Sequence, residues 1–443
     1  MQTYKRVCAR TDLWVYTCHY LPLNGTPTTP LETTHLGPVL AYGHSSWLTM
    51  SSYSRSERFA YLTLVALYYY GRLLCVFDWK LEKSKMLVRP TKCTNRILLL
   101  IWRIFITMIF ISVMPSMMAP FQRLSIDSFL AFFANLQVIT VTLFSVISFL
   151  IQELSERKIF KIIEKIVKIY KRIYGKSHVR QILGRTFVFS VITKLLLSFL
   201  GLIYEVPLIL EGDQSVKSLC GIYLWLGTIY TLDACFLGFL IIGQMYTAMA
   251  AHLGEMVQTM RDYESEESRS TLSKHERMKR LCVHSDSIDD SNNIYFVLYG
   301  LTKQFHHIFR WQLIYSIYYN FVIILMVMHS FIWQYIYAGY VDFLALFSSL
   351  FKLWNLAMLI LAAHGVVEKS QLPDLLNLDL VCSDIDARWD ESVEAFICQR
   401  KVENLEIKVL GFFHLNNEFI LVIISAIMSY LFILIQFALT KQQ

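Results

Sequence analysis

Residues 418–439 read EFILVIISAIMSYLFILIQFAL, and this stretch decides the fold. Glu418 is its single charged residue, so as an α-helix it can cross a bilayer, which takes about 20 largely apolar residues. Six other segments meet the same criterion: 97–118, 129–151, 186–209, 219–245, 312–337 and 343–366. The sequence therefore predicts an all-α membrane protein with seven transmembrane helices.

The composition supports lipid as the solvent. Of the 443 residues, 55% are hydrophobic and only 17% charged, and the mean hydropathy is +0.45. Soluble domains carry about 25% charged residues. The net charge of +7 comes from basic residues between the apolar runs, as in membrane orientation signals and not as in a nucleic-acid site. No Cys or His spacing suits a metal, and no histidine has a catalytic partner, so we expect neither an enzyme nor a cofactor.

The segment before the first span allows two interpretations. Segment 59–79 has only thirteen uncharged residues between Arg58 and Arg72, and crossing would put Arg72 in hydrocarbon. We predict a re-entrant or interfacial helix, with a further span as the alternative. Residues 1–58 carry prolines and no apolar period, which predicts a disordered leader, with Met50 as a candidate start. The receptor-like domain is then 59–443.

Basic residues set the expected orientation. Lys and Arg are enriched in the connections 80–96, 152–185, 246–311 and 367–417, and nearly absent from the alternate ones. Short cytoplasmic loops carry this excess, so we expect the N-terminus inside and the C-terminus outside. That orientation is opposite to that of G-protein-coupled receptors, and the chain also lacks their Asp-Arg-Tyr and Asn-Pro-x-x-Tyr motifs.

Two long loops on the predicted cytoplasmic side, 247–310 and 367–415, show helical apolar periods. We expect them to be helical extensions that pack as one assembly beneath the membrane, with surface amphipathic helices on lipid as the alternative. The residues that define the two apolar faces are Leu253, Met256, Val257, Met260, Val393, Phe396, Ile397, Val402, Leu405 and Val409.

The last span carries a polar stripe. At 100° per residue, Ser425, Ser429, Gln436 and Thr440 fall within a sector of about 60° on an otherwise apolar helix. Such a stripe either bonds to another helix of the same chain or faces a water-filled pore built from several subunits. In a pore, the neighbouring Phe432 and Ile433 can form a hydrophobic constriction.

Ionisable residues within the predicted spans mark a second candidate site, because a charge in hydrocarbon is costly. They are Lys194, Asp233 and Lys352. One interpretation is an ion pair between Asp233 and one of the lysines; the other is the wet floor of a ligand cavity. The aromatic walls of such a cavity would be Tyr223, Trp225, Tyr230 and Trp354, with an interfacial belt as the alternative role.

Three motifs resemble one family. Ser429–Phe437, SYLFILIQF, resembles the terminal TYhhhhhQF signature of insect gustatory receptors, where h is apolar, with Ser429 in place of Thr. GFFHLNNEF at 411–419 is similar to the stretch that leads into their last helix. Tyr68–Leu74, YYYGRLL, resembles their N-terminal aromatic-glycine motif. The resemblance covers about residues 59–443.

The resemblance implies a tetrameric, ligand-gated, non-selective cation channel in the plasma membrane of sensory neurons, in their dendrites. Its last helix would line the pore, with Gln436 facing the ions and Phe437 as its gating or packing neighbour. The cytoplasmic helices would anchor a homo- or hetero-tetramer, and a tastant would bind among the spans. The aromatic-rich bundle favours an apolar bitter compound. Alternatives are a receptor that signals through a cytoplasmic partner, an obligate co-receptor without its own ligand, and a transporter subunit.

Overall fold

The computed structural model describes residues 55–74, 79–82, 87–90, 97–109, 111–112, 128–176, 183–210, 215–264, 273–339, 343–372, 387–409 and 411–440. The predicted disorder of residues 1–54, and residues 113–118 of the first predicted span, lie outside the described residues.

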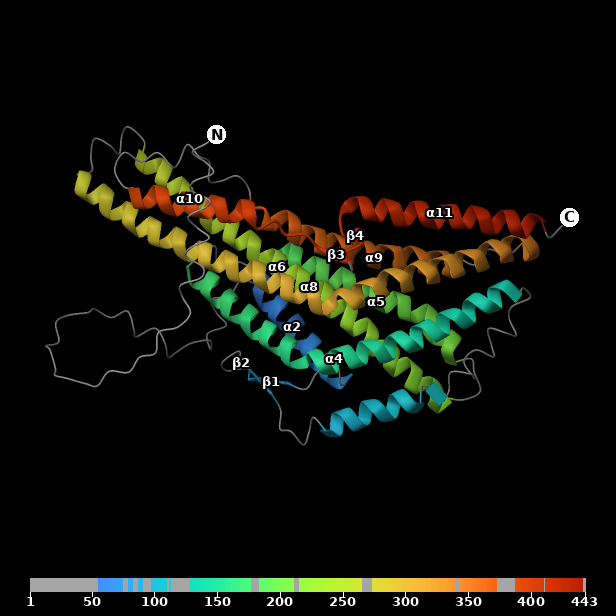
Figure 1. Cartoon of the computed structure of the whole chain (residues 1–443). Helices are drawn as coiled ribbons and strands as arrows, with labels where there is room; N and C mark the ends of the chain where they lie inside the picture. Colours follow the sequence, from blue (N-terminus) through green and yellow to red (C-terminus); the bar gives the residue numbers. More distant parts are fainter. Residues whose placement is uncertain are drawn as a thin grey trace. The chain divides into compact units, whose positions relative to one another are not determined.

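Helices make up nearly all of the described chain (Figure 1). They are α2 (Arg55–Leu73), a short helix Ile97–Ile109, α4 (Ser128–Lys176), α5 (Arg185–Leu210), α6 (Ser215–Glu264), α8 (Lys274–Ala338), α9 (Phe343–Ser370), α10 (Ala387–Val402) and α11 (Asn417–Thr440). All seven predicted spans fall within helices as far as they are described. α2 begins at Arg55, a few residues before residue 59, where the receptor-like domain was predicted to start.

Three described stretches are long and apolar enough to cross a membrane: Ile229–Asp262, Lys274–Ile336 and Phe343–Ser370. Ile97–Ile109 and Asn417–Ile433 are shorter apolar helices. The crossing of the remaining predicted spans, and the side on which each terminus lies, stay predictions.

Several helices continue without a break from a predicted span into the predicted cytoplasmic region. α8 is 65 residues long and α6 is 50, so loop 247–310 is largely helix, as expected. The start of α8 is fixed locally, because the Ser273 hydroxyl accepts a hydrogen bond from the Glu276 backbone N–H at 3.3 Å. Its end is set by Gly339, at φ 63°, a conformation that glycine adopts without strain.

α6 packs against four other helices: α4, α5, α8 and α9. Its core residues Phe239, Ile242 and Met245 are fully buried. Gly238 allows α8 to approach closely: a Cβ there would lie 2.2 Å from the ring of Phe305. Phe305 in turn meets Phe239 edge to face, with ring centroids 5.1 Å apart. The close approach of α6 and α8 therefore depends on the missing side chain.

The predicted apolar faces of the two long loops are buried. Leu253, Met256, Val257 and Met260 on α6 join one cluster with Val393, Phe396, Ile397, Leu405 and Val409. Val402 does not, since it is 80% exposed at the end of α10. The two loops therefore pack as one assembly, because their apolar faces contact one another, and its place beneath the membrane stays a prediction.

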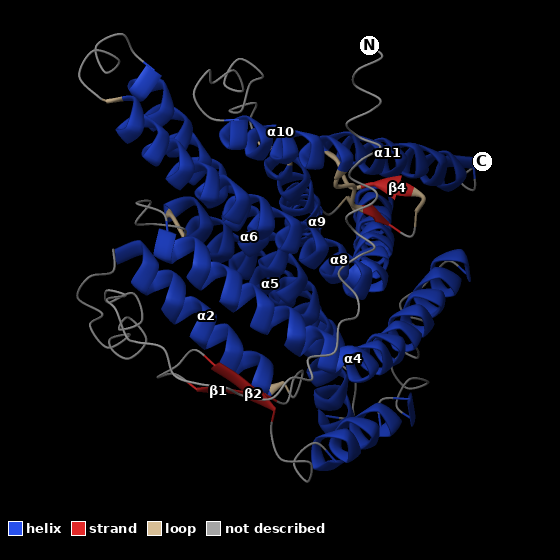
Figure 2. Cartoon of the chain, turned by 60° about the vertical axis from the view of Figure 1, so that its left-hand side comes forward, coloured by secondary structure: helices blue, strands red, loops and turns tan. Residues whose placement is uncertain are grey.

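Strands are confined to two small antiparallel hairpins among the described residues (Figure 2). β1 (Trp79–Glu82) pairs with β2 (Leu87–Pro90) after α2. β3 (Lys408–Val409) pairs with β4 (Phe413–His414), and Gly411 at φ 83° makes the turn. β3 packs on α8, so this second hairpin ties the start of α11 to the central helices.

Candidate functional site

The helix with the polar stripe, α11, is capped and packed through one face. Asn416 caps its start, since its Oδ1 accepts a hydrogen bond from the Phe419 N–H at 3.0 Å. Four buried residues spaced by four make the packing face: Phe419, Ile423, Ile427 and Leu431. This face contacts α8 and α9 (Figure 1). At 100° per residue, it is centred about 150° from the stripe.

The stripe itself points away from the chain's own packing. Ser425, Ser429, Gln436 and Thr440 are all exposed. The Ser429 hydroxyl donates only along its own helix, to the Ser425 carbonyl at 2.9 Å, and Thr440 donates likewise to Gln436 at 2.8 Å. Within the described chain, therefore, the stripe makes no hydrogen bond to another helix.

The two candidate constriction residues share the stripe's side of α11. Phe432 is 60% exposed and Ile433 is 46% exposed, and they lie on either side of the line through Ser425 and Gln436. Tyr430 lies on a different face, where its ring meets Phe321 of α8 edge to face with centroids 6.0 Å apart. The side chain of Phe437 lies outside the described part.

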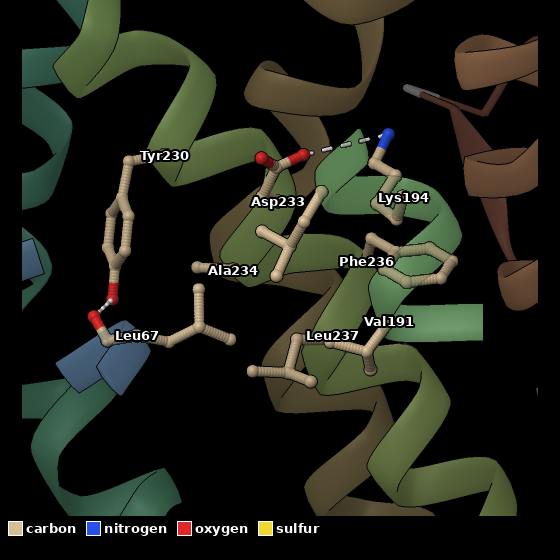
Figure 3. A pocket seen from close by; sticks show the side chains of 9 residues that line it. Leu67, Val191, Lys194, Tyr230, Asp233, Ala234, Phe236 and Leu237 are labelled. Atoms are coloured by element: carbon tan, nitrogen blue, oxygen red, sulfur yellow. Dashed lines mark hydrogen bonds and ion pairs between the residues drawn. The ribbon is translucent and has the colours of Figure 1, made fainter. Parts of the chain in front are cut away.

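The second candidate site is a polar cluster between α5, α6 and α9 (Figure 3). Lys194 Nζ lies 3.7 Å from Asp233 Oδ1, and both side chains are almost fully buried. The ammonium also donates to the Asn355 carbonyl at 3.1 Å and to the Asn355 side chain. Ser198 donates to Asp233 at 3.1 Å. Each charge is thus held by more than one polar partner, as a buried ion pair requires.

A small cavity adjoins the ion pair. Its volume is about 20 Å³. It has room for one or two waters in this conformation. Tyr230 closes one end by donating to the Leu67 carbonyl of α2 at 2.9 Å (Figure 3). The lining residues are Leu67, Val191, Lys194, Leu195, Tyr230, Asp233, Ala234, Phe236 and Leu237.

The structure brings together only some of the predicted pocket residues. Lys194, Tyr230 and Asp233 line one cavity, and Tyr223 packs against the small cluster of Leu74 and Tyr230. Lys352 is buried elsewhere on α9, with its Nζ 5.4 Å from the centre of the Tyr319 ring. Trp354 is 58% exposed on α9 and does not line this cavity, and the side chain of Trp225 lies outside the described part.

Sequence reasoning missed two members of the cluster. Ser198 lies four residues after Lys194 and therefore on the same helix face, a signal that was available. Asn355 is a polar residue within an apolar span, which also marks it as a candidate. Lys352 placed α9 among the candidate helices, but Asn355, three residues further on, makes the contact with Lys194.

Comparison with known proteins identifies the family of this chain. The profile of the 7tm Chemosensory receptor family matches residues 64–441. The chain belongs to this family. The resemblance to insect gustatory receptors is confirmed, since the chain is 38% identical to the Drosophila melanogaster gustatory receptor for bitter taste 93a, over 87% of this chain and 94% of that protein. It is also 20% identical to putative gustatory receptor 93b of the same species, over 72% of this chain and 79% of that one.

Solved structures support the fold of this chemosensory receptor. The olfactory receptor OR5 of Machilis hrabei superposes with a TM-score of 0.53 at 11% identity, over 85% of this chain and 99% of that one. The same receptor in complex with eugenol gives a TM-score of 0.50 at 14% identity, with the same coverage. At these identities the likeness concerns the fold alone.

Proposed function

We propose that this chemosensory receptor is a subunit of a tastant-gated, non-selective cation channel in which four copies of α11 surround a central pore. The observation that carries the proposal is the exposure of the α11 stripe. Hydroxyls and an amide on a predicted membrane helix would contact lipid if the chain worked alone, which is unfavourable. A water-filled pore between subunits gives them a polar environment.

The side chains on this face suit conduction. The Gln436 amide and the Ser425 and Ser429 hydroxyls can replace part of an ion's hydration shell. They carry no charge, which agrees with weak selectivity among cations. Phe432 and Ile433, exposed on the same side, would close the pore by excluding water, and Phe437 would pack behind Gln436.

For the ligand we propose a small organic bitter compound. A 38% identical relative is named as a receptor for bitter taste, and a receptor of the same fold has been solved with eugenol. Lys194, Tyr230 and Asp233 would form the polar end of the pocket, and Tyr223, Trp225, Lys352 and Trp354 remain candidates for its walls. The cavity would have to widen to admit such a ligand, because it now has room only for water.

The proposed topology is seven spans, with the N-terminus in the cytoplasm and the C-terminus outside, in the plasma membrane of a chemosensory dendrite. The packed extensions of α6, α8 and α10 would then form the cytoplasmic anchor of a homo- or hetero-tetramer. Anchor and pore would be joined through the β3–β4 hairpin, which leads directly into α11.

Patch-clamp recording tests the channel. Cells expressing the chain are challenged with a panel of bitter compounds and sugars, as wild type and as Gln436→Ala. We expect a cation current whose relative permeabilities change in the variant. Met428→Ala is the control, because Met428 is 48% exposed on the same helix but about 80° away from Gln436. A G-protein-dependent response without current would overturn the channel in favour of a receptor that signals through a partner.

A further inference from the structure

The half of α4 beyond its predicted span carries a row of basic side chains, here called the basic stripe: Arg157, Lys158, Lys161, Lys165 and Lys168. All five are exposed. At 100° per residue they occupy one sector of about 100° over three turns of the helix. The face beside this sector carries Ile162, Ile169 and Ile173, which are buried in the main core. One face of this half-helix therefore holds it to the chain, while the basic stripe stays free for a partner.

The charges of the stripe are not neutralised within the described part of the chain. Lys158, Lys161, Lys165 and Lys168 form no ion pair there. Arg172, one turn further on, is paired with Asp290 of α8. Glu164 is the acidic residue nearest the stripe on the helical wheel, and it too is exposed. The stripe thus has a strong positive charge at its near end, and α4 is fastened at its far end.

The position of the stripe along α4 points to a membrane partner. Since α4 is one continuous helix of 49 residues, Arg157 lies about 9 Å and Lys161 about 15 Å beyond residue 151, where the apolar segment ends. The headgroup layer extends about 5–8 Å beyond the hydrocarbon, and the field of anionic lipids reaches about 10 Å further. Long lysine side chains can bridge the remainder.

From this placement we propose that the basic stripe of α4 binds multiply charged anionic phospholipid headgroups, of the phosphoinositide class, in the cytoplasmic leaflet. Clusters of four to eight Lys and Arg next to a transmembrane helix have this chemistry. Several phosphates on one headgroup can contact neighbouring lysines of the stripe at once. The bound lipid would hold the membrane-proximal part of α4, which packs on α8 and α6. The inference rests on the cytoplasmic placement proposed above, but not on the channel activity.

The test uses the purified full chain in neutral detergent and measures binding of dioctanoyl phosphatidylinositol bisphosphate, with dioctanoyl phosphatidylcholine as the neutral probe. In the stripe variant Lys158, Lys161 and Lys165 become Gln. In the control variant Lys274, Arg277 and Lys279 become Gln, which removes the same charge from the start of α8, about 50 Å along that helix from its apolar segment. Monodisperse elution shows that both variants are folded.

We expect the wild type and the control variant to bind the bisphosphate lipid in a salt-dependent way, and the stripe variant to bind it about 100-fold more weakly. Equal affinity of all three proteins, or an equal loss in both variants, would overturn the proposal. So would full displacement of the lipid by an equal concentration of ATP, because the stripe would then be a general polyanion site.

A second measurement separates this proposal from the function on which it rests. In cells expressing Lys161→Cys, a membrane-impermeant maleimide should label the added thiol, above the wild-type background, only after permeabilisation. Labelling of intact cells would overturn both the topology and the lipid site. Cytoplasmic labelling with specific lipid binding but without any tastant current would leave the lipid site standing and contradict only the channel.

Discussion

Lys194 of α5 and Asp233 of α6 form a buried ion pair, with 3.7 Å between Nζ and Oδ1, and Asn355 of α9 completes the coordination of the ammonium. The pair therefore links three helices through one group. Removing either partner leaves a buried charge without its counterion, which typically costs about 3–5 kcal/mol.

We accordingly predict that Lys194→Met and Asp233→Leu each lower the melting temperature of the detergent-solubilised chain, measured by size-exclusion chromatography after heating. The double variant Lys194→Met/Asp233→Leu should recover much of the loss, because it removes both charges and fills the site with apolar atoms. Losses that simply add in a double variant would show that the two residues act independently.

The contact of Gly238 with Phe305 gives a second stability prediction. Gly238→Ala places a Cβ where the Phe305 ring now lies, so α6 and α8 must separate or the ring must move. We expect destabilisation of about 1–3 kcal/mol, as for overpacked cores. Gly227→Ala on the same helix is the matched control, since nothing lies within 4 Å of its added Cβ, and helix propensity should make it neutral or stabilising. An equal melting temperature for both variants would contradict the close packing.

The buried faces of the helices were predictable from the spacing of apolar residues along the sequence. Leu253 and Phe396 are buried as their helical spacing indicates, because an apolar face has to be covered. Val402 has the same spacing, but it is the last residue of α10, beyond the residues that pack, and it is exposed. The apolar spacing does not show where the packing along a helix ends, because that depends on tertiary contacts.

The candidate sites were predictable to a different degree. The stripe on α11 follows from angles along one helix, so Ser429 and Gln436 share a face in the structure as in the sequence. The ion pair of Asp233 required a choice between Lys194 and Lys352 on separate helices, and neither periodicity nor composition fixes which helices are neighbours.

The side chain of Phe432 should control the closed pore if α11 lines it. We predict that Phe432→Ala raises the current recorded without any tastant, because a smaller side chain lets water and ions pass the constriction. Ile424→Ala is the control on the same helix, as Ile424 is 38% exposed but about 80° away from Phe432. Unchanged basal current in Phe432→Ala, at equal surface expression, would remove this residue from the gate.

Acidification should weaken the hold of the β3–β4 hairpin on α8 through His306, which lies outside the predicted spans. Burial lowers the pKa of His306 below its usual 6.5, helped by the nearby His307 and Arg310 and opposed by a hydrogen bond with the backbone of Lys408. The unfolded chain therefore binds this proton more readily, so the stabilising effect of neutral His306 is complete above pH 6.5 and is lost as the pH falls below it. We expect the melting temperature of the solubilised chain to fall between pH 7.5 and 5.5, and to fall less in His306→Gln. The control is His275→Gln, an exposed histidine near the start of α8, which should follow the wild type; identical pH profiles for all three proteins would show that His306 does not contribute.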